Sequence, residues 1–262
     1  MRRLLQRRAR SRLRRVADSV PYWFHSIDLG GGVVTNGARS ADDLARSLAE
    51  LHLPDLSGKT LLDIGAWDGF YSFAAERLGA RRIVALDHYV WKGVPRPWDR
   101  PLSELPDKRL GFSVAHKALG SRVESWTADF TTMDLAELGT FDVVLFAGVL
   151  YHLQNPCEAL QRVAQVTGEL AVIETAAVFV PGFEEFALCE FYETDQLGSD
   201  ATNWWAPNAK ALCGMCRAAG FDTANVMSGS LEENPVAVDL KRHRLIAHAS
   251  KFEHADTLGI AS

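Results

Sequence analysis

Short apolar runs alternate along most of the chain with longer segments whose apolar residues recur every three or four positions. The short runs have the length of buried strands and lie at residues 60–64, 82–86, 122–126, 141–146, 169–174, 223–226 and 244–248. The longer segments have the periodicity of amphipathic helices and lie at residues 70–78, 107–118, 155–166 and 207–219. This alternation predicts an α/β fold of the doubly wound type, with a mostly parallel sheet and helices on both of its faces.

Residues 1–20 form an Arg-rich arm ahead of this alternation. Its first 15 residues contain eight Arg and no acidic residue, whereas the rest of the chain has 20 Lys and Arg against 33 Asp and Glu. We interpret the arm as a solvated or loosely docked helix, and contact with nucleic acid or an anionic surface is the alternative. The acidic remainder is a poor match for a polyanionic partner.

Residues 21–57 form a cap segment that is aromatic at its start and Gly-rich in its middle. The turn signal at Asn36-Gly37 predicts a two-stranded flap, whose second strand contains Val33 and Val34. Such a flap could cover a pocket, and packing of its aromatic residues on the core is the alternative. After the flap, Ser40 is the expected N-cap of a helix that runs through Leu51.

The overall composition is that of a globular protein. The chain has 262 residues, of which 47% are hydrophobic and 23% are charged. No apolar run approaches the roughly 20 residues of a membrane span, and the N-terminus lacks the apolar region of a secretory signal. Four cysteines are too few for a disulfide framework, and Cys213-x-x-Cys216 has no second pair that would predict a zinc site. We therefore expect a cytoplasmic protein.

A glycine-spaced turn follows the strand at residues 60–64. The strand carries Asp63, and Gly65 allows the backbone to turn sharply at its end. Gly69 then allows the start of the next helix to lie close to a ligand. A second apolar strand ends in Asp87, about 20 residues after the glycines, where a carboxylate reaches the hydroxyls of a ribose. The pattern predicts a nucleotide-type pocket at the carboxyl ends of parallel strands.

The pattern D-x-G-x-x-x-G, followed by a strand that ends in Asp, resembles the class I S-adenosylmethionine-dependent methyltransferases over about residues 58–250. The usual turn of that family is D/E-x-G-x-G-x-G, so Trp67 is a departure at its middle position. The resemblance implies a Rossmann-like sheet of seven strands and S-adenosylmethionine as the cofactor. It also implies that Asp129 accepts a hydrogen bond from the adenine and that Phe130 packs against the base. The cofactor-binding residues that we expect are Asp63, Gly65, Ala66, Asp68, Gly69, Asp87, His88, Asp129, Phe130 and Ala147.

The string Gly148-Val-Leu-Tyr151-His152 follows the strand at residues 141–146. It is similar to the branch that contains tRNA wobble-uridine carboxymethyl transferases, and to related enzymes that methylate sugars and small molecules. Transfer of a methyl group to an alcohol requires removal of the hydroxyl proton, and the pKa of His suits that work. His152 is therefore the expected base, with Tyr151 and Glu174 supporting it. A structural role for His152 is the alternative.

Residues 183–209 combine aromatic side chains with carboxylates and amides and contain no Lys or Arg. Aromatic faces and carboxylates suit a sugar, whereas a nucleic-acid groove combines aromatic residues with Lys and Arg. A lid whose acidic residues face solvent is the alternative. A divalent ion such as Mg²⁺, held by carboxylates with His88 or His152, is left open. The expected acceptor-binding residues are His25, Asp28, Glu190, Tyr192, Asn203 and Trp204.

The sequence therefore predicts an O-methyltransferase that acts on a hydroxyl of a small polar acceptor, of which a mannoside-type sugar is the example that we favour. Its catalytic domain would span residues 58–252, with a lid at residues 180–208 and a tail at residues 253–262. The first alternative is an enzyme that modifies the wobble uridine of tRNA, and the second is a non-catalytic cofactor-binding protein. Nucleic acid is the less favoured partner, and a homodimer is compatible with the sequence.

Overall fold

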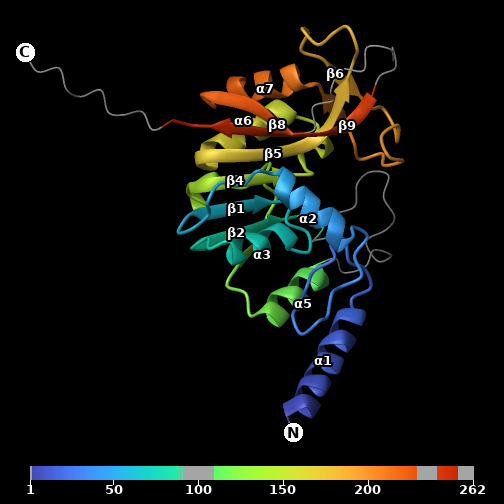
Figure 1. Ribbon diagram of the computed structural model, residues 1–262. Helices are drawn as coiled ribbons and strands as arrows, with labels where there is room; N and C mark the ends of the chain where they lie inside the picture. Colours follow the sequence, from blue (N-terminus) through green and yellow to red (C-terminus); the bar gives the residue numbers. More distant parts are fainter. Residues whose placement is uncertain (1, 89, 91–108, 229–240, 253–262) are drawn as a thin grey trace, which may run out of the picture. The chain divides into compact units, whose positions relative to one another are not determined.

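The computed structural model describes residues 2–88, 90, 109–228 and 241–252 (Figure 1). Most of the segment between Asp87 and Arg109, and the whole of the tail at residues 253–262, lie outside these ranges. The chain divides into two compact units. The first unit comprises Met1–Asp134 with Glu193–Thr202, and the second comprises Leu135–Tyr192 with Asn203–Ser262.

Three parallel strands form the sheet of the first unit. β1 (Thr60–Ile64) pairs with β2 (Arg82–Asp87), and β2 pairs with β3 (Glu124–Thr127). Every residue of β1 is buried, as expected for a strand that is covered on both faces. Because the strands are parallel, their carboxyl ends lie along one edge of the sheet.

Helices surround these strands in the first unit. Among the described residues they are α1 (Arg2–Asp18), α2 (Ala41–Glu50), α3 (Phe70–Arg77) and α5 (Arg109–Leu119). The Ser40 side chain accepts a hydrogen bond from the backbone of Asp43, which confirms it as the N-cap of α2. α3 contacts β1 and β2, and Phe112 of α5 stacks on Phe73 of α3, with 5.3 Å between the ring centroids.

The second unit contains parallel and antiparallel strands. β4 (Phe141–Ala147) pairs in parallel with β5 (Thr167–Phe179). β9 (Lys241–Ser250) then pairs antiparallel with β5, and β8 (Thr223–Ser228) pairs antiparallel with β9. β5 has 13 residues, longer than the expected strand at 169–174, because its second half pairs along β9.

Two helices cover this part of the sheet. α6 (Pro156–Val166) contacts β4 and β5, whereas α7 (Ala209–Ala218) contacts β8 and β9 and also touches α6. Short 3-10 helices occupy Leu135–Glu137 (η2) and Leu150–His152 (η3). Within the segment expected to be a lid, β6 (Cys189–Phe191) and β7 (Trp205–Pro207) form a separate two-stranded sheet.

The strand order of the seven-stranded sheet is β3-β2-β1-β4-β5-β9-β8. This order confirms the predicted α/β fold with a mostly parallel seven-stranded sheet. No helix in the described ranges has the length and apolar character that crossing a bilayer requires.

The predicted two-stranded flap is wrong in its detail. Residues 25–39 contain isolated bridges between His25 and Arg39 and between Asp28 and Val34, and no named strand. The alternative interpretation holds for Trp23, which is buried and donates its indole N–H to the carbonyl of Ala17. The segment is therefore packed on the first unit through its aromatic residues.

Candidate functional site

Three carboxylates of the first unit come from the carboxyl ends of its three parallel strands. Asp63 lies in β1 and Asp87 ends β2, while Asp129 follows β3 by two residues. The strands pair in register, so the three acidic residues lie at the same edge of the sheet. This is the edge at which ligands of open α/β sheets bind.

The turn after β1 has a left-handed backbone at every second residue. Gly65 has φ of 82°, Trp67 has φ of 50° and Gly69 has φ of 84°. Trp67 thus has the backbone conformation that glycine adopts at little cost, although an L side chain there costs about 1–2 kcal/mol. Its backbone N–H donates to Oδ2 of Asp87 at 3.0 Å, which ties the turn to the end of β2.

Gly69 begins α3 where no side chain would fit. A Cβ atom at this position would lie 2.7 Å from the ring of Phe112 and 2.8 Å from that of Phe73. The rings of Phe112 and Phe73, together with the positive φ, therefore require glycine at this position.

Asp63 is buried and accepts a hydrogen bond from the hydroxyl of Ser72 at 2.5 Å. Burial raises its pKa to about 7, which the hydrogen bond from Ser72 opposes and the negative charge of Asp87 increases. Its contact with Ser72 links β1 to α3, so Asp63 stabilises the turn between these two elements.

Asp68 connects the turn to the N-terminal segment. Its side chain is fully buried, and Oδ2 accepts the backbone N–H groups of Phe24 at 2.6 Å and His25 at 2.9 Å. Oδ1 is buried with no hydrogen-bond partner among the described residues, and a Cβ at Gly111 would lie 2.5 Å from it. Burial raises the pKa of Asp68 to about 6. The two backbone N–H groups occupy only one of its oxygens, and the predicted contact of Asp68 with a cofactor stays a prediction.

Aromatic packing also connects the turn after β1 to the N-terminal segment. The ring of Phe24 stacks on the indole of Trp67, with centroids 4.1 Å apart and 12° between the planes. Tyr22 lies on the indole as well, at 6.4 Å between centroids. The residue that departs from the family pattern is thus the one that the cap segment covers.

Asp87 is nearly buried, and both of its oxygens accept backbone N–H groups. Oδ2 accepts from Trp67, and Oδ1 accepts from Val90 at 3.1 Å. A carboxylate at the carboxyl end of a parallel strand is the group that takes ribose hydroxyls in nucleotide pockets. This donor set fits the ribose of the predicted cofactor.

The third strand end has a matching arrangement. Oδ1 of Asp129 accepts the backbone N–H and the hydroxyl of Thr131 at 2.9 and 2.7 Å, and Oδ2 lies 3.9 Å from Nδ1 of His88. Phe130 is buried directly after it. Ala147 is half-buried at the end of β4, in the second unit. The predicted roles of these residues towards adenine stay predictions.

The structure does not bring the two acceptor candidates of the cap segment together. His25 is buried, with its pKa lowered to about 3 by burial and by the positive charge of Arg39. Asp28 is exposed, and its carboxylate accepts the backbone N–H of Gly30 in a turn. A neutral buried imidazole and an exposed turn residue share no site.

In the second unit, Tyr151, Glu174 and Arg244 form one cluster. The guanidinium of Arg244 pairs with both carboxylate oxygens of Glu174, and one of these contacts measures 2.8 Å. The same guanidinium lies 4.5 Å from the centroid of the Tyr151 ring. Gly148, with φ of 73°, lies between them, because a Cβ there would lie within 4 Å of all three side chains.

His152 lies beside this cluster on η3. Its ring is tilted by 42° against that of Tyr151, with 4.1 Å between the centroids. The backbone of Tyr151 accepts the N–H of Trp204 at 2.8 Å, which holds η3 against the start of β7. Glu174 was expected to support His152, and its partner in the structure is Arg244.

The side chains of Glu190 and Tyr192, which were expected to bind the acceptor, contact each other. The Tyr192 hydroxyl donates to Glu190 at 2.8 Å, and Arg242 pairs with the same carboxylate. Burial and the bond to Glu190 raise the pKa of Tyr192 to about 12, and its side chain is 1% exposed. Asn203 is buried and Trp204 is half-buried. Among these four acceptor candidates, only Glu190 and Trp204 present surface to a ligand.

The described residues contain no group of three or more His, Cys, Asp or Glu arranged for a metal ion. All four cysteines are free, including Cys213 and Cys216.

Sequence reasoning missed the two arginines of β9. Arg242 and Arg244 lie two positions apart in β9, on either side of His243, so they share one face of the strand. This spacing was visible in the sequence, but their acidic partners lie 52 and 70 residues away. The antiparallel register between β5 and β9 sets Arg244 opposite Ala176, two residues from Glu174, whereas the partner of Arg242, Glu190, lies in β6.

Comparison with known families gives one match over most of the chain. Residues 37–226 match the family described as a methyltransferase domain.

The curated relatives match this chain over only part of their own length. A tRNA U34 carboxymethyltransferase of Colwellia psychrerythraea (strain 34H / ATCC BAA-681) is 30% identical over 197 residues, which are 69% of this chain and 50% of that protein. The protein of the same description from Pseudomonas savastanoi pv. phaseolicola is 26% identical over 211 residues, covering 78% of this chain and 59% of that protein. The chain thus spans about half the length of the curated relatives that it matches.

Among solved structures, the N-terminal domain of EvdMO1, crystallised in the presence of SAH and D-fucose, is similar at a TM-score of 0.62 and 22% identity. The match covers 96% of this chain and 97% of that one. At this identity the likeness shows the fold.

Proposed function

Because this chain belongs to the methyltransferase-domain family, as a class I S-adenosylmethionine-dependent methyltransferase, we propose that it methylates a hydroxyl group of a small polar acceptor, in the manner of an O-methyltransferase acting on a sugar. The observation that carries the choice of acceptor is the absence of Lys and Arg from residues 183–209, a segment rich in aromatic residues and carboxylates. That composition suits sugar hydroxyls and opposes a phosphate backbone.

The cofactor would supply a methyl group on a sulfonium, from which it leaves readily. Asp87 and Asp129 would hold its ribose and adenine, since Asp87 ends β2 and Asp129 follows the end of β3 by two residues. The turn from Gly65 to Gly69 would form one wall of the cofactor site. We infer that the buried Asp63 and Asp68 support this turn.

The chemical requirement on the protein is to orient the acceptor hydroxyl and accept its proton. His152 is the proposed base. Tyr151 and the pair of Glu174 with Arg244 would fix its surroundings, because the ring of Tyr151 contacts both the imidazole and the guanidinium. The imidazole would accept the hydroxyl proton as the oxygen takes the methyl group, and the carbon–sulfur bond that breaks would release S-adenosylhomocysteine.

The test is a screen of the purified protein with S-adenosylmethionine against methyl glycosides, phenols and bulk tRNA, with S-adenosylhomocysteine as the readout. His152→Ala should lower turnover about 100-fold, in line with general-base contributions, and should leave cofactor affinity unchanged. His52→Ala is the matched control, since His52 is an exposed histidine at the end of α2. Full turnover in His152→Ala would remove His152 from the mechanism. Cofactor binding without turnover on any acceptor would support a non-catalytic binding protein.

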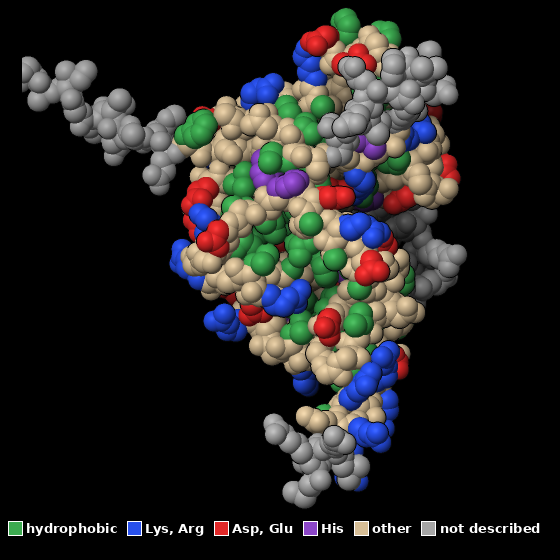
Figure 2. All heavy atoms as spheres, in the orientation of Figure 1, with side chains coloured by type: hydrophobic (Ala, Val, Ile, Leu, Met, Phe, Trp, Pro, Cys, Tyr) green, Lys and Arg blue, Asp and Glu red, His purple; other side chains and the backbone are tan. Residues whose placement is uncertain are grey.

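Modification of tRNA is the second candidate, and two observations favour it. The curated relatives are described as tRNA U34 carboxymethyltransferases. In addition, Lys and Arg side chains gather over α1, as Figure 2 shows in blue. The exposed arginines of this helix are Arg7, Arg8, Arg10, Arg12, Arg14 and Arg15.

Charge neutralisation separates the two candidates. Replacing Arg7, Arg8 and Arg12 with Gln should abolish salt-sensitive binding of tRNA if the helix holds a phosphate backbone. Arg77→Gln with Arg81→Gln is the control, since both residues are exposed in the first unit but outside α1. Turnover on a glycoside that is unaffected by either set, without tRNA binding, would support the small acceptor.

A further inference from the structure

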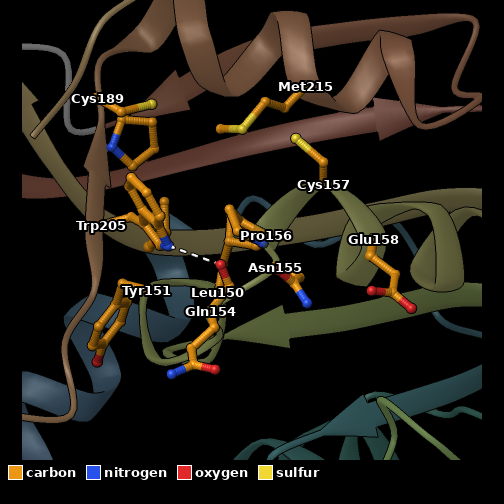
Figure 3. Close-up of a pocket in the computed structure, with 12 residues that line it drawn as sticks. Leu150, Tyr151, Gln154, Asn155, Pro156, Cys157, Glu158, Cys189, Trp205 and Met215 are labelled. Atoms are coloured by element: carbon orange, nitrogen blue, oxygen red, sulfur yellow. Dashed lines mark hydrogen bonds between the residues drawn. The ribbon is translucent and has the colours of Figure 1, made fainter. Parts of the chain in front are cut away.

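The second unit contains a cavity of about 580 Å³ beside Tyr151 (Figure 3). Its size is within the range of ligand pockets, which measure about 300–1,000 Å³. Its walls come from η3, the start of α6, the β6–β7 pair, β5 and α7. The lining residues are Leu150, Tyr151, Gln154, Asn155, Pro156, Cys157, Glu158, Thr175, Cys189, Trp205, Pro207 and Met215.

The walls of the cavity are mainly apolar. The apolar lining residues include Trp205, Leu150, Met215 and two prolines, and the ring of Tyr151 adds to them. Among the lining residues Glu158 alone carries a charge, and it is exposed at the start of α6. With no Lys or Arg in its lining, the cavity is unsuited to a phosphate or a polynucleotide. It suits a neutral, largely apolar group.

Two features prepare the cavity for a ring-shaped group. The indole N–H of Trp205 donates to the carbonyl of Gln154 at 3.2 Å, which holds the ring at the cavity wall (Figure 3). Thr175 is fully buried, and its hydroxyl has no hydrogen-bond partner within the described part of the chain. A buried hydroxyl without a partner costs about 1–3 kcal/mol, so a bound ligand with one polar group would gain from meeting it.

We propose that this cavity binds the apolar aglycone of a glycoside acceptor, which means that the substrate is a neutral aryl or alkyl glycoside rather than a free sugar. The inference rests on the proposed O-methyltransferase function. Tyr151 belongs both to the cavity wall and to the cluster beside the proposed base His152, so an aglycone in the cavity places its sugar next to that cluster. The aglycone would then determine which sugar is presented for methylation.

Binding is tested first without methyl transfer, with 4-nitrophenol as the probe. Cys157 and Cys189 are free, exposed and part of the lining, so their alkylation by iodoacetamide reports on the cavity. Cys213 is free and partly exposed outside the lining and is the internal reference. We expect 4-nitrophenol to slow alkylation of Cys157 and Cys189 in proportion to its occupancy and to leave the rate at Cys213 unchanged. Equal rates with and without the probe would overturn the site.

A second experiment fills the cavity with a larger side chain. Met215→Trp places a larger side chain into it, whereas Met227→Trp makes the same change at a 42% exposed position on β8. By calorimetry, Met215→Trp should weaken binding of 4-nitrophenol about tenfold or more, as expected when an apolar ring loses its space, and Met227→Trp should not. Equal affinity in the two variants would contradict the assignment.

The acceptor is tested by comparing 4-nitrophenyl and methyl α-D-mannopyranosides. The wild type should have a KM about tenfold or more lower for the aryl glycoside, in line with apolar discrimination in pockets, and Met215→Trp should remove the difference. Equal KM values with intact 4-nitrophenol binding would overturn the aglycone role. If neither glycoside is methylated while the probe protects both cysteines, the cavity stands as an apolar binding site and the proposed function fails.

Discussion

Replacing Asp68 with Asn should change how the stability of the protein depends on pH. The side chain is fully buried, and burial is the main cause that raises its pKa to about 6 from the usual 3.8. Two backbone N–H groups of the cap segment partly offset this effect by bonding to Oδ2. Folding therefore favours the protonated acid over the carboxylate, and an amide is neutral at every pH.

The magnitude follows from the two pKa values. A rise from 3.8 to about 6 is worth about 3 kcal/mol, at about 1.36 kcal/mol for each pH unit. Because the folded state binds the proton more tightly, the stabilising contribution is complete below pH 3.8 and is lost as the pH rises through 6. Asp68→Asn should abolish this loss. Asp63, whose pKa is about 7, should leave a residual slope of the same sign in the variant.

The assay is urea unfolding, followed by far-ultraviolet circular dichroism, at half-unit steps between pH 4 and pH 8. Part of the ~3 kcal/mol is already lost at pH 4, so the wild type should lose about 2 kcal/mol more than Asp68→Asn over this range. Asp42→Asn is the matched control, because Asp42 is an exposed carboxylate in the first turn of α2. Its profile should follow that of the wild type.

An unchanged pH slope in Asp68→Asn would refute this account of the buried carboxylate. A carboxyl signal of Asp68 that titrates below pH 4 in the folded protein, measured by nuclear magnetic resonance, would refute it independently. In either case the two N–H groups of Phe24 and His25 would outweigh the burial.

Three further changes test the two candidate sites. Asp87→Ala should lower affinity for S-adenosylmethionine by about 1–3 kcal/mol in calorimetry, since it removes a charge-assisted bond to the ribose. Arg244→Lys should lower turnover about tenfold with cofactor affinity intact, because Lys retains the charge but loses the paired contact and the stacking over Tyr151. Gly69→Ala should cost about 2–4 kcal/mol in urea unfolding, because of its positive φ and the Phe112 ring 2.7 Å away.

The strands and helices of the core were predictable because their signal is local. β1, at Thr60–Ile64, matches its predicted range, since a continuous apolar run followed by a glycine turn has few other interpretations. The C-terminal part of β5 was not predicted, because the signal for it is not local. Residues 175–179 extend the strand because β9 pairs with them, and β9 lies more than 60 residues later in the chain.

The same distinction holds for the candidate sites. The acidic strand ends were visible in the sequence, because a strand places its last residue at the sheet edge whatever its partners are. The partners of Asp68 were not visible, since the backbone N–H groups that it accepts belong to residues 43 and 44 positions earlier. Apolar cavities are harder still, and the one beside Tyr151 combines segments that begin at residue 150 and end at residue 215.

Trp67 shows how a departure from a family pattern can be understood physically. The turn requires a left-handed backbone at the middle position, and Trp67 adopts it with φ of 50° at a cost of about 1–2 kcal/mol. Stacking on Phe24 contributes about 0.5–1.5 kcal/mol beyond the apolar area that it buries. Adjacent to it, Asp68 holds the same cap segment through two N–H groups. The indole and the carboxylate together therefore hold Phe24 and His25 of the cap segment against the turn after β1.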